Sequence, residues 1–347
     1  MGKAGAARKL ASAAALGGGG LSLLGGALYG VLTAQAKLAR KAIGPRLEST
    51  PDSSGWYGRG RPGPTVKVAL IGDSGAAGYG VDAVEETPGA LLASGLADQA
   101  ERRVYLRAIA VVGAQSSDLE GQVSRALPIE PDVAVILIGA NDVTHSVLPS
   151  QSVRHLGEAV RRLVDAGVAV VVGTCPDLGT VTPIPPPLRQ VARSWSRRLA
   201  AAQTITVIEA GGRSVSLGSI LGPEFAAAPG VFFGPDRFHP SVDGYRSLVA
   251  VLLPSVLAAI GLIPDDEAAP QAFRGESVLP IAAAAVEAVR TPGTELDGTE
   301  VAGQQRGLRG RWVELRHRRR HPQSDVEKPD VEAQDAADPP GEPGRVV

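Results

Sequence analysis

Short apolar runs alternate with amphipathic stretches from Val66 to about residue 260, and this alternation constrains the fold more than any other feature. The pattern predicts strands near 66–71, 104–111, 133–138, 168–173 and 204–209, and helices near 87–100, 118–127, 150–166, 187–202 and 241–260. Strands and helices that alternate in this way build a parallel sheet covered by helices on both sides. We therefore expect an α/β domain.

The first of these strands ends at a serine set among glycines. Four apolar residues, Val68 to Ile71, suit a strand that is buried on both faces, and the sequence Gly-Asp-Ser-Gly follows at once. Ser74 would then lie at the carboxyl end of a central strand. Ligands and reacting groups collect at that edge of an open parallel sheet, so partners for Ser74 are expected on the other strand ends.

A serine hydroxyl needs a base that accepts its proton, and the base needs an orienting carboxylate. His239 precedes the last helix in a loop rich in glycine and proline, with Asp236 three positions earlier. This spacing allows the aspartate to reach one ring nitrogen while the other faces outward. His145 competes for the role, because it follows the strand 133–138 and reaches the same edge. His155 falls on the polar side of its predicted helix and is given no chemical role.

Two further strand ends offer hydrogen-bond donors for a negatively charged substrate oxygen. Asn141 lies on a glycine-containing turn just past the strand 133–138, and Gly113 follows the strand 104–111. Together with the amide of Ser74 they would form a three-part oxyanion hole. His145 then becomes a candidate for the substrate pocket or for a structural hydrogen bond, and Asp142 a brace for the Asn141 turn.

Four blocks of this sequence resemble the SGNH or GDSL-type serine hydrolases in the order of that family. The blocks are Gly72-Asp73-Ser74 with Gly78, then Gly113, then Gly139-Ala140-Asn141-Asp142, then Asp236-Arg237-Phe238-His239-Pro240. The resemblance implies a three-layer α/β/α fold with a flavodoxin-like sheet. It also implies Ser74 as nucleophile, His239 as base, Asp236 as its orienter, and Ser74, Gly113 and Asn141 as oxyanion donors. Gly75 stands where the family's name has leucine.

The expected activity is that of a serine esterase, which needs no metal and no organic cofactor. Its substrate would be a small-molecule, lipid or acylated-glycan ester. A membrane-tethered acyltransferase or a binding module on the same fold is the alternative, because hydrolases and transferases share one triad. A nucleotide-binding module is less favoured, because the glycines of 72–80 lack the G-x-G-x-x-G order and leave Asp236 and His239 without a purpose.

Composition excludes some other classes. The formal net charge of the 347 residues is −1, which gives no general attraction to nucleic acid. The single cysteine, Cys175, excludes an internal disulfide and a cysteine-rich zinc site.

Both ends of the chain differ from its middle. Residues 1–43 contain an uncharged stretch from Leu10 to Ala36 between basic residues, which predicts a signal sequence, with a possible cleavage site at 34–36, or a retained membrane anchor. The protein is then expected to be exported or anchored in the cell envelope. A flexible arm rich in alanine and glycine is the third, less favoured interpretation of this stretch. Residues 44–65 are expected to be a linker, 66–263 the hydrolase domain, and 264–347 a largely disordered charged tail, in which 282–290 can form a short helix.

Overall fold

Five parallel strands form the centre of the sheet in the computed structural model, which describes residues 26–44, 49–263, 278–290, 294–299 and 312–317. They are β2 (Val66–Gly72), β3 (Val104–Ala108), β4 (Val133–Leu137), β5 (Ala169–Gly173) and β6 (Arg213–Val215). Their order across the sheet is β3-β2-β4-β5-β6. This is the order of flavodoxin-like folds, in which ligands bind where the strand order reverses. The reversal falls between β2 and β4.

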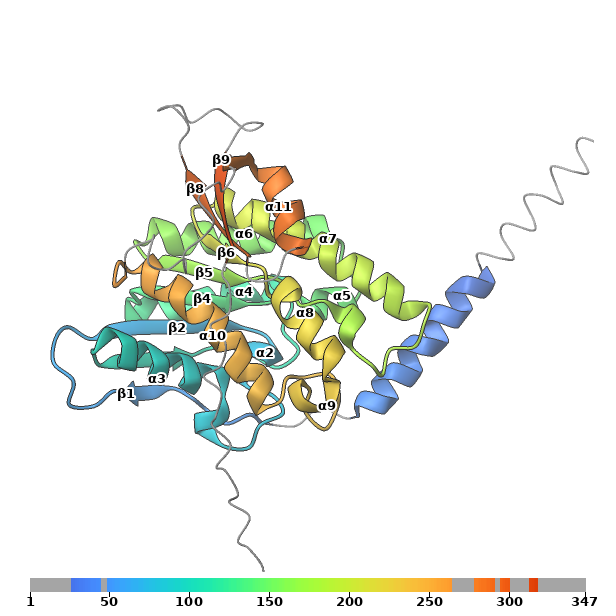
Figure 1. Cartoon of the computed structure of the whole chain (residues 1–347), viewed down its shortest axis with the longest axis horizontal. Coiled ribbons are helices and arrows are strands. Elements are labelled where there is room, and N and C mark those ends of the chain that lie inside the picture. The colour runs from blue at the N-terminus through green and yellow to red at the C-terminus, as the bar shows by residue number, and fades with distance from the viewer. Residues whose placement is uncertain (1–25, 45–48, 264–277, 291–293, 300–311, 318–347) are drawn as a thin grey trace, which may run out of the picture.

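Helices cover both faces of this sheet, so the predicted three-layer α/β/α class is confirmed (Figure 1). On one face α3 (Pro88–Ala100) packs against α10 (Val242–Ala259). On the other face α4 (Leu119–Ala126) packs against α6 (Pro149–Asp165), and α7 (Leu188–Glu209) lies beside α6. Short helices occupy the loops beyond the strands: α2 (Ser74–Ala77), α5 (Ala140–Thr144), α8 (Leu217–Ala227), α9 (Pro229–Phe232), and 3-10 turns at Val84–Glu86, Ser116–Asp118, Leu127–Ile129 and Leu178–Thr180.

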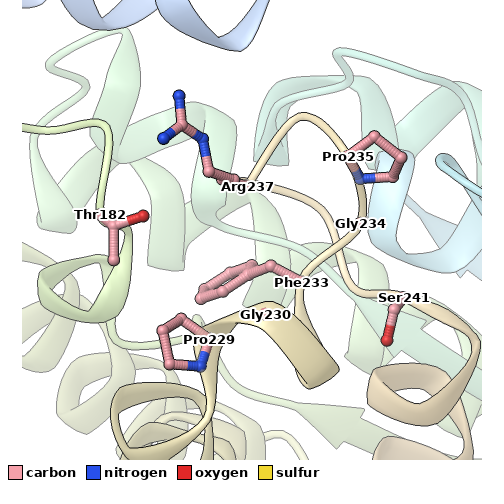
Figure 2. A pocket seen from close by; sticks show the side chains of 8 residues that line it. All are labelled: Thr182, Pro229, Gly230, Phe233, Gly234, Pro235, Arg237 and Ser241. Carbon is pink, nitrogen blue, oxygen red and sulfur yellow. The ribbon is translucent and has the colours of Figure 1, made fainter.

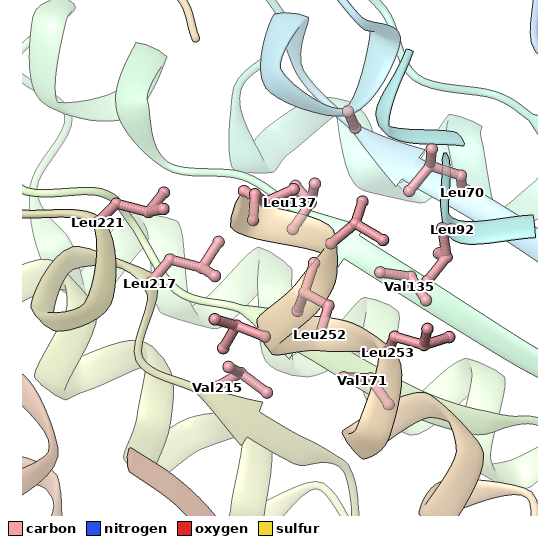
Figure 3. Close-up of a cluster of buried hydrophobic side chains, with 14 of the residues drawn as sticks. Leu70, Leu92, Val135, Leu137, Val171, Val215, Leu217, Leu221, Leu252 and Leu253 are labelled. Carbon is pink, nitrogen blue, oxygen red and sulfur yellow. The ribbon is translucent and has the colours of Figure 1, made fainter. Parts of the chain in front are cut away.

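Alternate residues of each central strand enter two separate apolar cores. In β2, Val68 and Leu70 belong to the core under α3 and α10, whereas Ile71 belongs to the core under α4 and α6. Figure 3 shows the first of these cores, where Leu252 and Leu253 of α10 lie among side chains from the strands. Burial on both faces explains why the central strands are continuous apolar runs in the sequence.

The sheet begins earlier than the sequence indicates. β1 (Gly55–Tyr57) lies inside the expected linker 44–65 and pairs antiparallel with β3. Trp56 lies opposite Tyr105 in this pair, with ring centroids 5.0 Å apart. Aromatic pairs of this kind stabilise an edge strand, so the end of the expected linker is part of the domain.

The sheet also continues into the expected tail 264–347. Beyond β6 lie β8 (Thr294–Thr299), β9 (Trp312–His317) and β7 (Val278–Pro280), each antiparallel to its neighbour. The short helix expected at 282–290 is present as α11 (Ile281–Arg290), and it packs against α7 and β8. Part of the predicted tail therefore belongs to the folded domain. The rest of the predicted tail, 264–277, 291–293, 300–311 and 318–347, lies outside the described residues.

The strand expected at 204–209 is wrong, because these residues form the last turns of α7. Their β-branched side chains favour a strand. In the fold, however, Val207 is buried against the core shared with α6, and Ile208 is buried on another side against α11. The burial of these side chains on two sides of the helix outweighs the weak intrinsic preference of residues 204–209 for a strand. The chain then turns at Gly211, with φ +88°, before β6 begins.

Residues 26–43 form a helix at one end of the domain, drawn in blue in Figure 1. Three hydrogen bonds connect it to the last residue of α5, to the loop after β5 and to the first residue of α7. They run from Gln35 Nε2 to the Pro186 carbonyl (2.7 Å), from the Leu188 amide to Gln35 Oε1 (3.1 Å) and from Arg40 to the Thr144 carbonyl (3.2 Å). Residues 1–25 of the predicted signal or anchor lie outside the described residues.

α10 is long and apolar enough to cross a membrane, and no other helix in the described ranges meets both conditions. Of its 18 residues, 67% are buried inside the domain, where the helix packs against α3 and the sheet. A core helix of a folded domain has this composition, so we assign α10 to the core.

Candidate active site

The turn after β2 brings Ser74 to the carboxyl edge of the sheet, where the strand order reverses. Gly72 has φ +143°, and a Cβ atom there would lie 1.9 Å from the Leu137 carbonyl oxygen of β4. Glycine is therefore required for this close approach of two strand ends. Asp73 then caps α2, because its side chain accepts a hydrogen bond from the Gly75 amide at 2.9 Å.

Ser74, His239 and Asp236 are hydrogen-bonded in series. The Nε2 atom of His239 lies 2.9 Å from the Ser74 hydroxyl oxygen, and Nδ1 lies 2.6 Å from Asp236 Oδ2. A proton on Nδ1 satisfies the carboxylate and leaves Nε2 as an acceptor for the hydroxyl. The fold thus brings together three predicted residues, of which Ser74 and His239 are 165 positions apart in the sequence.

Backbone hydrogen bonds fix the loop that carries Asp236 and His239. Oδ1 of Asp236 accepts from the amides of Phe238 (2.9 Å) and His239 (3.0 Å), while Oδ2 holds the imidazole. Burial raises the pKa of Asp236, but the hydrogen bonds from His239 and from the Phe238 amide outweigh it and lower the pKa below its ordinary value. Asp236 is therefore ionised at neutral pH.

Two aromatic side chains enclose His239, and neither is among the predicted site residues. The Tyr79 ring lies over the imidazole with a centroid distance of 4.0 Å, and Phe238 approaches edge-on at 4.9 Å. Tyr245 holds Tyr79 in place, because its hydroxyl donates to the Tyr79 carbonyl at 2.7 Å. This packing restricts rotation of the imidazole. The available signal for Tyr79 in the sequence is that a bulky aromatic residue stands among glycines, shortly after Ser74.

The three predicted oxyanion donors lie on turns at the same edge of the sheet. Ser74 begins α2, Asn141 lies in α5 directly after β4, and Gly113, with φ +86°, lies in the loop after β3. In the part of the chain that the structure describes, neither the two backbone amides nor the Asn141 side-chain amide has a hydrogen-bond partner. All three donors are therefore available to a ligand.

Asp142 braces the turn that carries Asn141, as the sequence predicts. Its buried carboxylate accepts from the Ser116 amide at 3.1 Å and from the Ser152 hydroxyl at 2.7 Å. These bonds connect α5 to the loop after β3 and to the start of α6. The position of Asn141 thus depends on three elements at once.

Asp73 is buried directly beside Ser74. Burial raises its pKa to about 7, and the nearby charge of Asp142 acts in the same direction, against the lowering effect of hydrogen bonds from the Gly75 and Gly139 amides. Burial likewise raises the pKa of the Cys175 thiol, which is free and buried. Cys175 is therefore a neutral core residue.

Two buried glutamines that are not among the predicted site residues hold the strand ends. Gln122 of α4 accepts from the Gly72 amide (2.7 Å) and donates to the Gly72 carbonyl (2.9 Å). Gln203 of α7 accepts from the Cys175 amide (2.7 Å) and donates to the Ile138 carbonyl (3.0 Å). Each lies on the buried stripe of its helix. A polar residue on an apolar stripe is the signal by which the sequence could have indicated a buried hydrogen-bonding role.

His145 and His155 are not part of the Ser74 series. His145 ends α5, where its Nδ1 donates to the Asn141 carbonyl at 2.8 Å, and its ring is exposed. His155 lies on α6 beside Glu158, 3.9 Å away. Over the described ranges, no group of three or more His, Cys, Asp or Glu residues is placed to hold a metal ion.

A serine, a histidine and an aspartate in hydrogen-bonded series, with free amide donors nearby, form the arrangement that serine hydrolases use. The model of the GDSL-like lipase/acylhydrolase family matches residues 70–247. A GDSL-like esterase of Mycobacterium tuberculosis is 44% identical over 256 residues, which cover 70% of this chain and 80% of that protein. The chain belongs to the GDSL-like lipase/acylhydrolase family and is a carboxylic ester hydrolase.

Solved structures are similar at lower identity. A lipase/acylhydrolase from Enterococcus faecalis is 21% identical, with a TM-score of 0.43, over 55% of this chain and 95% of that chain. A variant of an acetyl-xylooligosaccharide esterase from Geobacillus stearothermophilus is 19% identical, with a TM-score of 0.44, over 56% of this chain and 94% of that chain.

Proposed function

We propose that the protein hydrolyses its ester through an acyl-enzyme on Ser74, with His239 as the base and Asp236 as its orienting carboxylate. The observation that carries this proposal is the series of hydrogen bonds, 2.9 Å from Ser74 to His239 and 2.6 Å from His239 to Asp236. A serine hydroxyl becomes a nucleophile when a base takes its proton, and an ionised carboxylate stabilises the imidazolium that forms. The lowered pKa of Asp236 supports the last role.

The reaction has two halves. The Ser74 oxygen attacks the ester carbonyl while His239 Nε2 takes the hydroxyl proton, and the tetrahedral intermediate collapses as the alcohol leaves with that proton. Water then attacks the acyl-enzyme, His239 takes a proton from it, and Ser74 leaves with the proton as the carboxylic acid is released. No step requires a metal or an organic cofactor.

The amides of Ser74 and Gly113 and the side chain of Asn141 would bind the oxygen that becomes negatively charged in both intermediates. Their lack of internal hydrogen-bond partners within the described residues supports this role. Donors that are fixed in advance and unpaired lower the energy of the charged intermediate without reorganising the site.

Replacement of Ser74 by alanine tests the proposal. We expect the variant to lose at least about 10³-fold in kcat/KM on short-chain 4-nitrophenyl esters, and to lose labelling by a fluorophosphonate probe that modifies the parent protein. An unchanged rate or unchanged labelling would exclude Ser74 as the nucleophile.

Alanine variants of His239 and His145, the two histidines at the carboxyl edge, test which of them is the base. His239→Ala should reduce kcat by a factor similar to that for Ser74→Ala, because the two residues act as a unit. His145→Ala should retain most of the activity, because the ring is exposed and bonded to its own helix. Equal losses in the two variants would remove His239 from its proposed role.

We also propose that the N-terminal segment is a retained anchor of the cell envelope and not a cleaved signal. Cleavage at 34–36 would remove or truncate the residues around Gln35, whose side chain is hydrogen-bonded to the loop after β5 and to the first residue of α7. An envelope location would bring lipid esters and acylated glycans within reach of Ser74. Intact-mass analysis of protein from the membrane fraction tests this proposal, and a mature chain that starts after Ala36 would contradict it.

A further inference from the structure

We infer that Arg237 and the cavity beside it form a subsite for an oxyanion, a carboxylate or a phosphate, that the ester substrate carries. The inference rests on the proposed function, because it concerns the substrate that Ser74 attacks. The inference adds a preference for anionic over neutral esters, which the esterase mechanism by itself does not require.

The cavity has a volume of about 420 Å³. Apart from Thr182, its lining residues lie between 229 and 241, in the segment that carries Asp236 and His239. Pro229, Phe233 and Pro235 supply apolar surface, and Thr182 of the loop after β5 forms the opposite side (Figure 2). A volume of this size accommodates part of a small organic molecule. The loop that lines the cavity also carries Asp236 and His239. We therefore include in the inference that a substrate bound at Ser74 extends along this loop into the cavity.

Among the residues that the structure describes, Arg237 is the single charged residue that lines the cavity. Its side chain leaves the loop on the side that faces Thr182 and points away from Ser241 (Figure 2). In the ranges that the structure describes, its guanidinium has no hydrogen bond and no ion pair. The adjacent carboxylate of Asp236 is occupied by the imidazole and by two backbone amides. The positive charge is therefore available to a ligand.

The backbone of Arg237 is in an unfavourable conformation. Its φ is +55°, in the left-handed region that glycine and asparagine enter more readily than arginine. The hydrogen bond from its amide to the Gly234 carbonyl (2.9 Å) and the bonds of Asp236 to the next two amides hold this turn. A long cationic side chain at a position that suits glycine indicates a function for the side chain.

An arginine above an apolar cavity fits an ester that carries an oxyanion beyond an apolar spacer. The guanidinium donates paired hydrogen bonds to carboxylate and phosphate groups, and the proline and phenylalanine side chains accept the spacer. Both oxyanions share this chemistry, and they would reach the cavity from the acyl or the alcohol part of the ester.

Two matched pairs of esters test the inference on the full-length protein. 4-Nitrophenyl hydrogen suberate and 4-nitrophenyl octanoate differ in a carboxylate on the acyl chain, and butyryl glycerol 3-phosphate and monobutyrin differ in a phosphate on the alcohol. We expect the parent to prefer the anionic ester in one pair at least. Arg237→Gln should lower the anionic-to-neutral ratio of kcat/KM in that pair at least about tenfold, with the neutral ester changed less than about threefold.

Three variants separate charge from backbone effects. Arg237→Gly removes the charge but suits the left-handed conformation, so it should lose the same preference as Arg237→Gln while unfolding at a higher temperature than that variant. Arg237→Lys should keep most of the preference. Arg154→Gln, on the exposed side of α6, changes the net charge equally and should keep the ratio unchanged.

The preference of the parent should also weaken as salt is raised, because exposed charges are screened. A ratio unaffected by Arg237→Gln and Arg237→Gly in both pairs would overturn the inference while leaving the esterase mechanism intact. If the parent shows no activity on the neutral esters, or if Ser74→Ala remains active on them, the proposed function is overturned instead.

Discussion

Asn141 owes its place to the carboxylate that follows it in the sequence. Asp142 accepts hydrogen bonds from the Ser116 amide and the Ser152 hydroxyl, whereas the Asn141 side chain has no hydrogen-bond partner among the described residues. Adjacent residues thus divide two tasks, since one fixes the turn and the other presents a donor. A donor fixed in this way can stabilise charge that develops during the reaction.

Replacement of Asn141 by alanine should lower kcat by about 10²–10³-fold, because one oxyanion donor is removed, and should leave KM nearly unchanged. Steady-state kinetics on a short-chain 4-nitrophenyl ester measure the effect. Asp142→Asn is the companion variant and should unfold more easily, because it breaks a buried hydrogen-bond network. A loss below threefold in Asn141→Ala would remove this side chain from the oxyanion hole.

The residues that lie at the carboxyl edge of the sheet are easier to find in the sequence than the residues that surround them. Ser74 and Asn141 could be found because they follow apolar runs, and parallel strands bring their carboxyl ends to one edge. Gln122 and Gln203 could not be assigned, because a polar residue on a buried helix stripe does not reveal which backbone groups it will meet. Tyr79 likewise depends on a tertiary contact with His239.

At the scale of elements, the ends of β2 and β4 approach so closely that one side chain would not fit between them. The missing Cβ of Gly72 would lie 1.9 Å from the Leu137 carbonyl oxygen. The amide and carbonyl of Gly72 are at the same time paired with Gln122 of α4. The turn that precedes Ser74 is therefore fixed by the neighbouring strand and by a helix beneath the sheet.

Gly72→Ala should destabilise the protein by about 3 kcal/mol or more, because a methyl group at this position overlaps backbone atoms and φ is +143°. Gly121→Ala is the matched control in α4, where no atom lies within 4 Å of the added methyl. It should stabilise the protein by about 0.5–1 kcal/mol. Urea unfolding measures both, and similar values for the two variants would contradict the packing described for Gly72.

The elements differ in how far the sequence predicts them. Long apolar runs such as Val133–Leu137 identify the central strands, because burial on both faces leaves no polar alternative. β1 has three residues and lies between glycine- and proline-rich segments, so its pairing with β3 has no local signal. The end of α7 has a misleading signal, because β-branched residues in 204–209 are buried on two sides of a helix.

At the scale of the whole molecule, the buried carboxyl group of Asp73 makes stability depend on pH. Its pKa is about 7 in the folded protein and near 4 in an unfolded chain. Between these values the folded state holds a proton that the unfolded state has lost. Stability therefore falls as the pH rises from about 4 to 7.

The free energy of unfolding should fall by about 2 kcal/mol more between pH 5 and pH 7 in the parent than in Asp73→Asn. The asparagine cannot ionise, and its side-chain oxygen can still accept from the Gly75 amide. Urea unfolding followed by circular dichroism at pH 5, 6 and 7 measures the difference. Asp243→Asn, at an exposed carboxylate paired with Arg246, should keep the slope of the parent. Equal slopes in the parent and Asp73→Asn would show that Asp73 is ionised throughout this range.

If the N-terminal segment is the retained anchor that we propose, the helix 26–43 would set the distance between the membrane and the carboxyl edge of the sheet. The helix is attached through Gln35 and Arg40 to the end of α5, to the loop after β5 and to the start of α7, which lie at that edge. From Gly26 to Gln35 the helix rises by roughly 14 Å, at about 1.5 Å for each residue. With an anchor in the residues before it, the domain would stand at a fixed distance and tilt above the bilayer. The enzyme would then select esters by how far they project from the membrane as well as by their chemistry.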